Sequence, residues 1–344
     1  MKAGKERLLV FVLPFTKMVS NYVRAQCLVG YQSDGWNFKF IQGAYPKFFN
    51  YFILRAIYRY WYYLDELITI NCRSELMVAY FIKPQSPFLL FIARRLLKIK
   101  VIVDVNDPYH LPELLGSKTT KSLFNNANWL VFESKEYYEY WSSYFGAISS
   151  IVSDTAQREY IYINLESREK SIIWIGSPKT SVYLVEFMEF FKKFNECGYK
   201  IKLLGAGDEV LVALKNLSIE FISIPFYDNS ILAHQLESSL ISFVPMPDDE
   251  LFNLRGNLKA KISMGYGCLV IASRNLMHER LINDKDNGFL FNTYKEFENI
   301  MEIIEDRKLA ASVAFNGNKW VADKYSRKQH AAKLIKIANF ISRN

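Results

Sequence analysis

The chain has 344 residues, half of them hydrophobic, so it has enough apolar residues for two packed cores and is not predominantly disordered. Its four scattered cysteines and four histidines give neither a disulfide framework nor a zinc-binding pattern. The net charge of +8 is uneven, because residues 1–100 hold 15 Lys and Arg against 5 Asp and Glu. An acidic partner surface is therefore expected for the first half only.

The first half alternates short apolar runs with helix-length segments, a pattern that favours a parallel sheet with crossover helices. The stretch "RLLVFVLPF" is short and no small-residue cleavage site follows it, which favours a buried strand over a signal peptide. No segment reaches the roughly 18 apolar residues of a membrane span, and the chain is expected to be cytoplasmic. The predicted strands are 7–15, 38–43, 76–82, 100–106, 129–134 and 149–153, and the predicted helices 19–30, 48–66, 86–98 and 135–144.

Segment 47–63, "KFFNYFILRAIYRYWYY", is basic and aromatic, with Arg55 and Arg59 one helical turn apart. Such a helix suits a membrane interface, with arginines on anionic lipid. A core helix with two arginines that extend to solvent is the alternative. Segment 93–100, "ARRLLKIK", adds positive charge. Nucleic acid is not expected as a partner, because no recognition motif is present.

The polar stretch 153–170 interrupts the alternation and is the best candidate for a linker. Beyond it the pattern resumes, so the chain is predicted to hold two doubly wound α/β domains in tandem. The tail 307–341 is predicted to be helical. The later predicted strands are 171–176, 200–207, 219–226, 239–246, 268–273 and 288–291, and the later helices 180–196, 208–216, 228–238 and 257–266.

Two glycine turns each follow a predicted strand and open a helix, which is an anion-binding geometry. The first contains Gly176, Ser177, Lys179 and Thr180, and the second is "LLGAGD", with Gly205 and Gly207. Either turn alone is explained by simple turn and helix-cap chemistry. Together, at the carboxyl ends of neighbouring strands, they indicate one ligand crevice.

A third group of residues adds positive charge near the start of the predicted helix 257–266. Arg255, Lys259 and Lys261 oppose the helix dipole there, an unfavourable arrangement unless an anion is bound. These side chains would neutralise a diphosphate. A solvated basic face is the alternative.

Taken together, "IIWIGSPKTSVYL", "KLLGAGD", "FVPM", "NLKAKISMGYGCLVIAS", Glu279 and "NDKDNGFLF" resemble the C-terminal domain of retaining family-4 glycosyltransferases of GT-B fold. The bacterial branch that builds O-antigen, capsule and other surface polysaccharides is the most similar. In the first half, "AYFIKPQSPF", "KVIVDVNDPYH" and "SNYVRAQCLVGYQSDG" resemble the family more loosely.

The resemblance implies an α/β GT-B fold, in which two Rossmann-like, doubly wound domains face a central cleft. We expect an acceptor-side domain at 1–160, a nucleotide-sugar domain at 161–320, and a C-terminal helix at 321–344 that packs back towards the first domain. It further implies a retaining hexosyl- or related sugar transferase that uses a UDP-sugar, without metal or other cofactor. The acceptor would be a lipid-linked or growing bacterial surface glycan, and the protein would be peripheral at the inner membrane face through 47–63 and 93–100.

Position by position, Lys259 matches the lysine that contacts the donor diphosphate, and Arg255 adds a second charge. Asp107 matches an acid that faces the donor sugar, and His110 lies near a position that many relatives fill with histidine, here Asn106. By the same resemblance, the donor-binding residues are Gly176, Ser177, Lys179, Thr180, Gly205, Gly207, Lys259 and Glu279.

The chain departs from the family at two glutamates that commonly hold the donor sugar and the ribose. Leu254 and Ile262 occupy those positions and cannot accept a hydrogen bond, although one of Asp248, Asp249 and Glu250 is a possible substitute for the first. An inactive nucleotide-binding or scaffold protein of the same fold, or a sugar-nucleotide epimerase, therefore remains an alternative. The acidic pairs around Asp104 and Asp248 are a weaker indication of metal binding.

Overall fold

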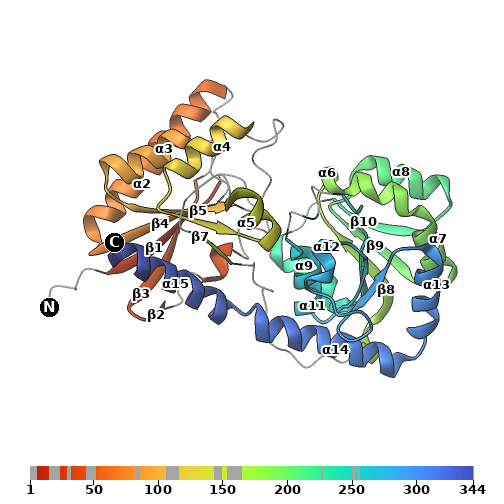
Figure 1. The fold of residues 1–344 in the computed structure, drawn as a ribbon. Coiled ribbons are helices and arrows are strands. Elements are labelled where there is room, and N and C mark those ends of the chain that lie inside the picture. Colours follow the sequence, from red (N-terminus) through yellow and green to blue (C-terminus); the bar gives the residue numbers. More distant parts are fainter. Residues whose placement is uncertain are drawn as a thin grey trace. The chain divides into compact units, whose positions relative to one another are not determined.

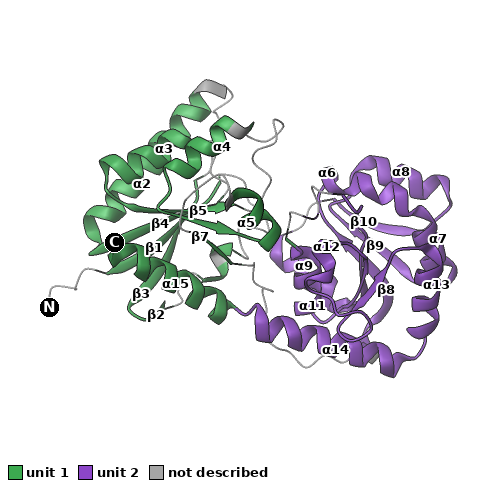
Figure 2. Cartoon of the chain, viewed as in Figure 1, with its two compact units in different colours: residues 1–154, 254–256, 327–344 green, residues 155–253, 257–326 purple. Residues whose placement is uncertain are grey.

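A computed structural model gives the structure of the protein and describes residues 6–14, 24–28, 32–43, 52–82, 86–105, 116–142, 149–152, 165–225, 228–249, 253 and 256–343. The chain forms two compact units (Figure 2). Unit 1 comprises residues 1–154, 254–256 and 327–344, and unit 2 comprises residues 155–253 and 257–326. Each unit contains one predominantly parallel sheet (Figure 1), which confirms the predicted α/β class.

The sheet of unit 1 has the strand order β2-β3-β1-β4-β5-β6-β7. Neighbouring strands are parallel, except that β2 and β3 form an antiparallel pair. Its strands are β1 (Arg7–Val12), β2 (Gln32–Ser33), β3 (Trp36–Ile41), β4 (Leu76–Ile82), β5 (Lys100–Val105), β6 (Trp129–Phe132) and β7 (Ser149–Ile151).

One face of this sheet packs against α2 (Phe52–Arg73), α3 (Pro87–Phe91), the π-helical turn η2 (Ile92–Leu96), α4 (Gly116–Asn125) and α5 (Lys135–Ser142). The other face packs against η1 (Gln26–Leu28) and α15 (Arg327–Arg343), the last helix of the chain. Asn339 of α15 accepts hydrogen bonds from Arg7 and from the Trp36 indole, at 2.6 and 3.0 Å. The last helix therefore contributes to the core of the unit that contains the first strand.

The sheet of unit 2 is wholly parallel, in the order β10-β9-β8-β11-β12-β13. This is the strand order of a doubly wound dinucleotide-binding fold, whose direction of winding reverses between β8 and β11. The strands are β8 (Glu169–Ile175), β9 (Lys200–Leu204), β10 (Phe221–Ile224), β11 (Ser239–Val244), β12 (Leu269–Ser273) and β13 (Phe289–Phe291).

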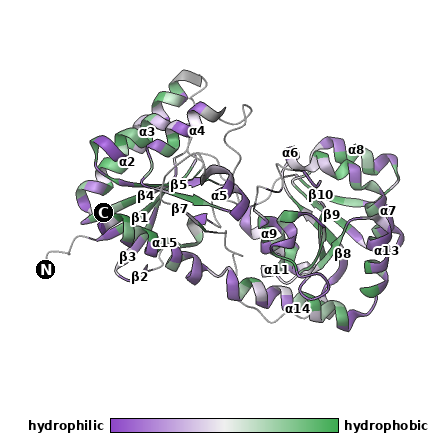
Figure 3. Cartoon of the chain, in the orientation of Figure 1, coloured by the Kyte–Doolittle hydropathy of each residue, from purple (hydrophilic) through white to green (hydrophobic). Residues whose placement is uncertain are grey.

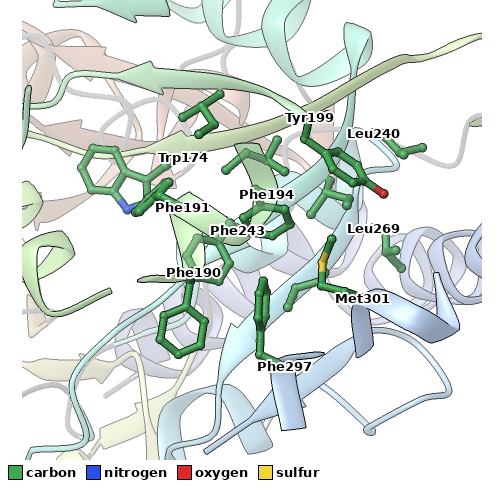
Figure 4. Close-up of a cluster of buried hydrophobic side chains, with 14 of the residues drawn as sticks. Trp174, Phe190, Phe191, Phe194, Tyr199, Leu240, Phe243, Leu269, Phe297 and Met301 are labelled. Carbon is green, nitrogen blue, oxygen red and sulfur yellow. The ribbon is translucent and has the colours of Figure 1, made fainter. Parts of the chain in front are cut away.

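The larger core of unit 2 is unusually aromatic. Figure 4 shows Phe190, Phe191, Phe194, Phe243 and Phe297 in one cluster, with Phe190 and Phe297 ring centroids only 4.9 Å apart. The helices around the sheet alternate hydrophobic and hydrophilic residues (Figure 3), as expected of elements with one buried face. The helices of unit 2 are η3 (Leu165–Ser167), α6 (Pro178–Ser181), η4 (Val182–Phe187), α7 (Met188–Glu196), α8 (Asp208–Asn216), α9 (Asn229–Ser238), α11 (Leu258–Gly265), α12 (Leu276–Glu279), α13 (Tyr294–Ile303) and α14 (Arg307–Lys324).

Each predicted strand is present, but several helices differ from the prediction. The predicted helix 180–196 becomes α6, a 3-10 segment at Val182–Phe187 and then α7, because valines and aromatics in that segment are weak α-helix formers. Helix α4 was not predicted, since its Ser and Thr residues give little apolar periodicity. The predicted helix 19–30 and the polar stretch 153–170 lie largely outside the described residues.

Candidate functional site

The candidate site lies within unit 2, at the carboxyl ends of its central strands. Four turns follow β8, β9, β11 and β12 there, and β8 and β11 flank the point where the winding reverses. Open α/β sheets bind ligands at such a point. The crossover connections of the two adjacent strands run in opposite directions there, and a crevice forms between them. The predicted glycine turns are the ones after β8 and β9.

The first turn is tightly packed around Gly176. A Cβ atom at this position would overlap the six-membered ring of Trp174 and would lie 2.9 Å from Thr180 Oγ1. Thr180 Oγ1 also accepts a hydrogen bond from the backbone N–H of Ser177 at 3.1 Å. The glycine is therefore required by the close approach of Trp174, and Ser177 and Thr180 form the helix cap that the simpler interpretation predicted.

A buried hydroxyl group joins this turn to the second one. Ser181 Oγ donates to the carbonyl of Pro178 and accepts from the backbone N–H of Gly207, both at 2.9 Å. Ser181 is fully buried. Gly205 has a φ of +77°, a conformation that glycine adopts without strain. The two predicted glycine turns are thus adjacent parts of one structure.

Helix α11 brings Lys259 to the same place, although it lies 79 residues beyond Thr180. The Lys259 ammonium is 3.5 Å from Thr180 Oγ1 and 4.7 Å from the centroid of the Trp174 ring. A cation over an indole face is electrostatically favourable. The predicted residues Gly176, Thr180 and Lys259 therefore converge, and they place a positive charge beside the first glycine turn.

The fourth turn of the candidate site follows β12. Ser273 Oγ donates to the Met246 carbonyl and accepts from the Met246 N–H, which joins the ends of β12 and β11. His278 Nδ1 lies 2.7 Å from the Ser273 carbonyl, and burial lowers the pKa of His278 to about 4. The positive charge of Lys259 lowers this pKa further.

Other predicted residues are placed differently. Lys179 and Ser177 are exposed. Glu279 lies 3.4 Å from Arg274, which also pairs with Asp284 at 2.8 Å. Lys261 is fully buried with its ammonium 5.0 Å from the Tyr325 ring centroid, and we assign it to packing in place of diphosphate binding. Ile262 is also buried. Arg255, Asp107, His110, Asn106, Leu254 and Glu250 lie outside the described residues.

The acidic residue Asp104 of unit 1 has a cationic partner. Arg24 donates to both of its carboxylate oxygens, at 2.9 and 2.8 Å, and lies 3.4 Å from Glu133. All three side chains are buried. Among the described residues, no group of three or more His, Cys, Asp or Glu side chains is arranged to hold a metal ion.

Sequence reasoning missed four residues of this site. Trp174 was taken only as a strand residue, and Ser181, Ser273 and His278 were not selected. Single serines and a single histidine carry no spacing pattern, and their roles depend on contacts with residues distant in the sequence. A polar residue at the carboxyl end of a predicted parallel strand, such as Ser273, was the one available signal.

Comparison with known proteins gives structural similarity but no sequence match: neither a protein-family model nor a curated protein matches the chain. HepE of Anabaena, solved in complex with UDP, is 12% identical with a TM-score of 0.65, and the match covers 97% of this chain and 99% of HepE. Sucrose-phosphate synthase from Thermosynechococcus elongatus is 12% identical with a TM-score of 0.69, over 98% of this chain and 100% of the other. A glycosyltransferase from Rickettsia africae is 13% identical with a TM-score of 0.63, over 98% and 99%. The chain therefore has the GT-B fold.

Proposed function

We propose that this GT-B protein is a glycosyltransferase that moves a sugar from a nucleoside diphosphate donor, a UDP-sugar, to an acceptor hydroxyl group. The observation that carries the proposal is the position of Lys259, whose ammonium lies between Thr180 and Trp174 beside the Gly176 turn. A diphosphate at this turn would meet that cation. Structures similar to this chain include HepE with UDP and with UDP-glucose, which supports UDP as the nucleotide.

The proposed reaction retains the configuration at the anomeric carbon. The bond between that carbon and the diphosphate oxygen breaks, and a bond to the acceptor oxygen forms on the same face. The acceptor proton passes to the departing phosphate, so no side-chain base is needed. Lys259 and the backbone N–H groups of the glycine turns would stabilise the charge that develops on the leaving diphosphate. Arg255 and Asp107 keep their proposed roles, as a second diphosphate contact and as an orienting acid facing the donor sugar.

Replacing Lys259 tests this function. We expect Lys259→Ala to lose both hydrolysis of the UDP-sugar and sugar transfer, whereas Lys215→Ala, which removes an exposed lysine of α8, should retain both. Release of UDP from a panel of UDP-sugars measures hydrolysis, and transfer is followed with labelled sugar. A wild-type protein that turns over no nucleotide sugar would contradict the proposal. It would favour an inert binding protein, the alternative suggested by the apolar Ile262.

We further propose that the acceptor is a lipid-linked or growing bacterial surface glycan and that segments 47–63 and 93–100 dock on anionic lipid. Among the described residues, no helix has the length and apolar character needed to cross a membrane. On α2, Leu54, Ile57 and Trp61 are 46, 49 and 67% exposed. Their spacing puts them on the helix face opposite the buried Tyr63 and Leu67. In the second segment Leu96 is 65% exposed beside Arg95.

A further inference from the structure

Unit 1 has a groove on its surface between helix α15 and the hairpin of β2 and β3 (Figure 1). The volume of this groove is about 600 Å³. Residues of α15 line one wall at intervals of three or four, which places them in one stripe along the helix. From Ala332 to Arg343 the stripe is about 16 Å long, at about 1.5 Å per residue. The groove therefore suits an elongated ligand.

The hairpin supplies the other wall of the groove through Asp34. Asp34 and Gly35 are the two residues between β2 and β3, and their φ angles are +50° and +76°. Positive φ at both residues is typical of a type I′ turn, a tight connection that matches the twist of the paired strands. The backbone of Asp34 therefore has a defined place at the groove, and its exposed carboxylate can accept hydrogen bonds there.

The helix wall of the groove is positively charged. Helix α15 has no acidic residue, and its basic residues are Arg327, Lys328, Lys333, Lys336 and Arg343. Of these, Lys336 and Arg343 line the groove. Among the described residues, neither forms a salt bridge, not even with Asp34 across the groove. The helix dipole favours Arg343 in the last turn but gives no reason for Lys336 in the middle of the helix. Two unpaired cations about two turns apart indicate anionic groups in the ligand.

Phe340 gives the groove an aromatic surface, and it lies between the two cations in the sequence. It is 45% exposed. Its ring packs edge-to-face against Trp129, with the ring centroids 5.3 Å apart, so the ring is supported while part of it remains open to solvent. The C–H faces of sugar rings stack on such a surface, whereas a small inorganic anion gains nothing from it.

Asn339 adds a hydrogen-bond donor to the same groove. Its Oδ1 accepts from Arg7 and from the Trp36 indole, so Nδ2 is the amide atom left to donate to a ligand. The groove thus combines an amide donor, a carboxylate acceptor, an aromatic ring and two cations. A sugar chain that carries both hydroxyl groups and acidic groups has the chemistry to contact all of them.

The place of the groove in unit 1 argues against a lipid surface as its occupant. Helix α15 covers one face of the sheet and α2 covers the other. If the exposed apolar face of α2 lies on a membrane, the groove is on the opposite side of the unit and faces away from that bilayer. A water-soluble ligand is therefore favoured.

We propose that the groove binds an anionic saccharide, a sugar chain with carboxylate or phosphate groups, as a second contact for the acceptor glycan. Lys336 and Arg343 contact the acidic groups, Phe340 stacks on a sugar ring, and Asp34 and Asn339 bind hydroxyl groups. The role as an acceptor contact rests on the proposed function, whereas binding of the saccharide is measured independently of it.

Calorimetric titration with defined oligosaccharides tests the proposal. The probes are tetragalacturonate, phosphorylated maltotetraose, neutral maltotetraose and inorganic phosphate. We expect at least one of the two anionic tetrasaccharides to bind the wild type about tenfold or more tightly than neutral maltotetraose, because it gains charge-assisted hydrogen bonds. Lys336→Gln combined with Arg343→Gln should remove this difference. Phe340→Leu, which keeps an apolar side chain but loses the flat ring, should bind the same probe more weakly.

A second pair of lysines on the same helix provides a matched control. Lys328→Gln combined with Lys333→Gln removes the same charge from exposed residues that do not line the groove, and this variant should bind every probe like the wild type. All variants should bind UDP like the wild type, and unchanged thermal unfolding shows that their fold is intact.

Several results would overturn the inference. Equal weakening by both pairs of substitutions would show a non-specific attraction to the basic helix. Inorganic phosphate that binds as tightly as the anionic tetrasaccharides would show a site for small anions. If neither anionic tetrasaccharide binds but anionic vesicles bind through Lys336 and Arg343, the groove contacts lipid.

Failure of the proposed function gives a different result. A wild-type protein that turns over a UDP-sugar but binds no anionic tetrasaccharide removes the inference and leaves the proposed function standing. A wild-type protein that binds an anionic tetrasaccharide but turns over no nucleotide sugar keeps the groove as a saccharide site and removes its role as an acceptor contact.

Discussion

The Lys259 ammonium lies 4.7 Å from the ring centroid of Trp174, a residue that is only 1% exposed. This pair places a cation next to an intrinsic fluorophore at the first glycine turn. The ammonium also lies 3.5 Å from Thr180 Oγ1, so a diphosphate bound at this turn would compete with the indole and the hydroxyl for it.

Binding of UDP is therefore expected to change the fluorescence of Trp174, because the ammonium would move towards the diphosphate and away from the indole. Emission is measured during a UDP titration. Trp174→Phe should abolish the change, and Lys259→Met should weaken UDP binding about 10- to 100-fold, since a charge-assisted hydrogen bond is lost. A full signal in Trp174→Phe would show that another tryptophan responds.

Gly176→Ala is expected to destabilise the protein by about 1–3 kcal/mol, the usual effect of overpacking. The new Cβ would overlap the Trp174 ring, which is buried and cannot move aside. Gly207→Ala is the matched control, because its Cβ would lie 3.3 Å from Pro178 and Ser181 side-chain atoms and needs only a small adjustment. Urea unfolding of both variants measures the difference, and equal stabilities would contradict the packing argument.

Acid should destabilise the protein partly through Glu169. Hydrogen bonds from Lys200, and next from Lys202, lower the pKa of Glu169 from 4.5 to about 2. The unfolded chain binds a proton at higher pH than the folded one, so this contribution is complete above about pH 4.5 and is lost as the pH falls towards 2. In Glu169→Gln, the free energy of unfolding should depend less on pH in that window. An unchanged slope would exclude Glu169 as a source of acid sensitivity.

Arg24→Met should destabilise unit 1 by about 3–5 kcal/mol, because it leaves the buried carboxylates of Asp104 and Glu133 without their cation. The double variant Arg24→Met, Asp104→Asn removes one uncompensated charge and should recover part of this loss. Chemical denaturation measures both. A double variant no more stable than Arg24→Met would mean that the Asp104 charge contributes little.

Liposome sedimentation tests the proposed membrane contact. With anionic vesicles, Ile57→Asp combined with Trp61→Asp should reduce binding, and Arg55→Glu combined with Arg59→Glu should reduce it at least about tenfold. Val212→Asp, at an exposed apolar residue of unit 2, is the control and should bind like the wild type. If vesicle binding falls only in Val212→Asp, or falls in none of the variants, segment 47–63 has no role in membrane binding.

The strands and the parallel class were predictable because continuous apolar runs such as "SIIWIG" and "LMVAYFI" mark strands buried on both faces. Helix boundaries were less predictable where local composition was ambiguous, as in the 3-10 segment after Ser181. Local preference and tertiary packing compete there, and the pattern alone does not decide between them.

The parts of the candidate site that depend on backbone turns were predictable, because glycines in the sequence mark those turns. Gly176 and Gly205 mark turns, and their place after strands indicated a shared crevice. The contact between Lys259 and Trp174 was not predictable, since it depends on how α11 is placed against β8. Lys259 and Lys261 are two residues apart and equally basic, yet one lies at the glycine turn and the other is buried against Tyr325, a difference set by helix orientation alone.

Helix α15 has a consequence for the order in which the protein folds during synthesis. Its buried residues, including Ala331, Leu334 and Ala338, cover one face of the sheet that begins with β1. That apolar face lacks its α15 cover until the ribosome has made unit 2 and then residues 327–343. Unit 2 has no such dependence on α15 for its own core, so the domain encoded second can be the first to complete its packing.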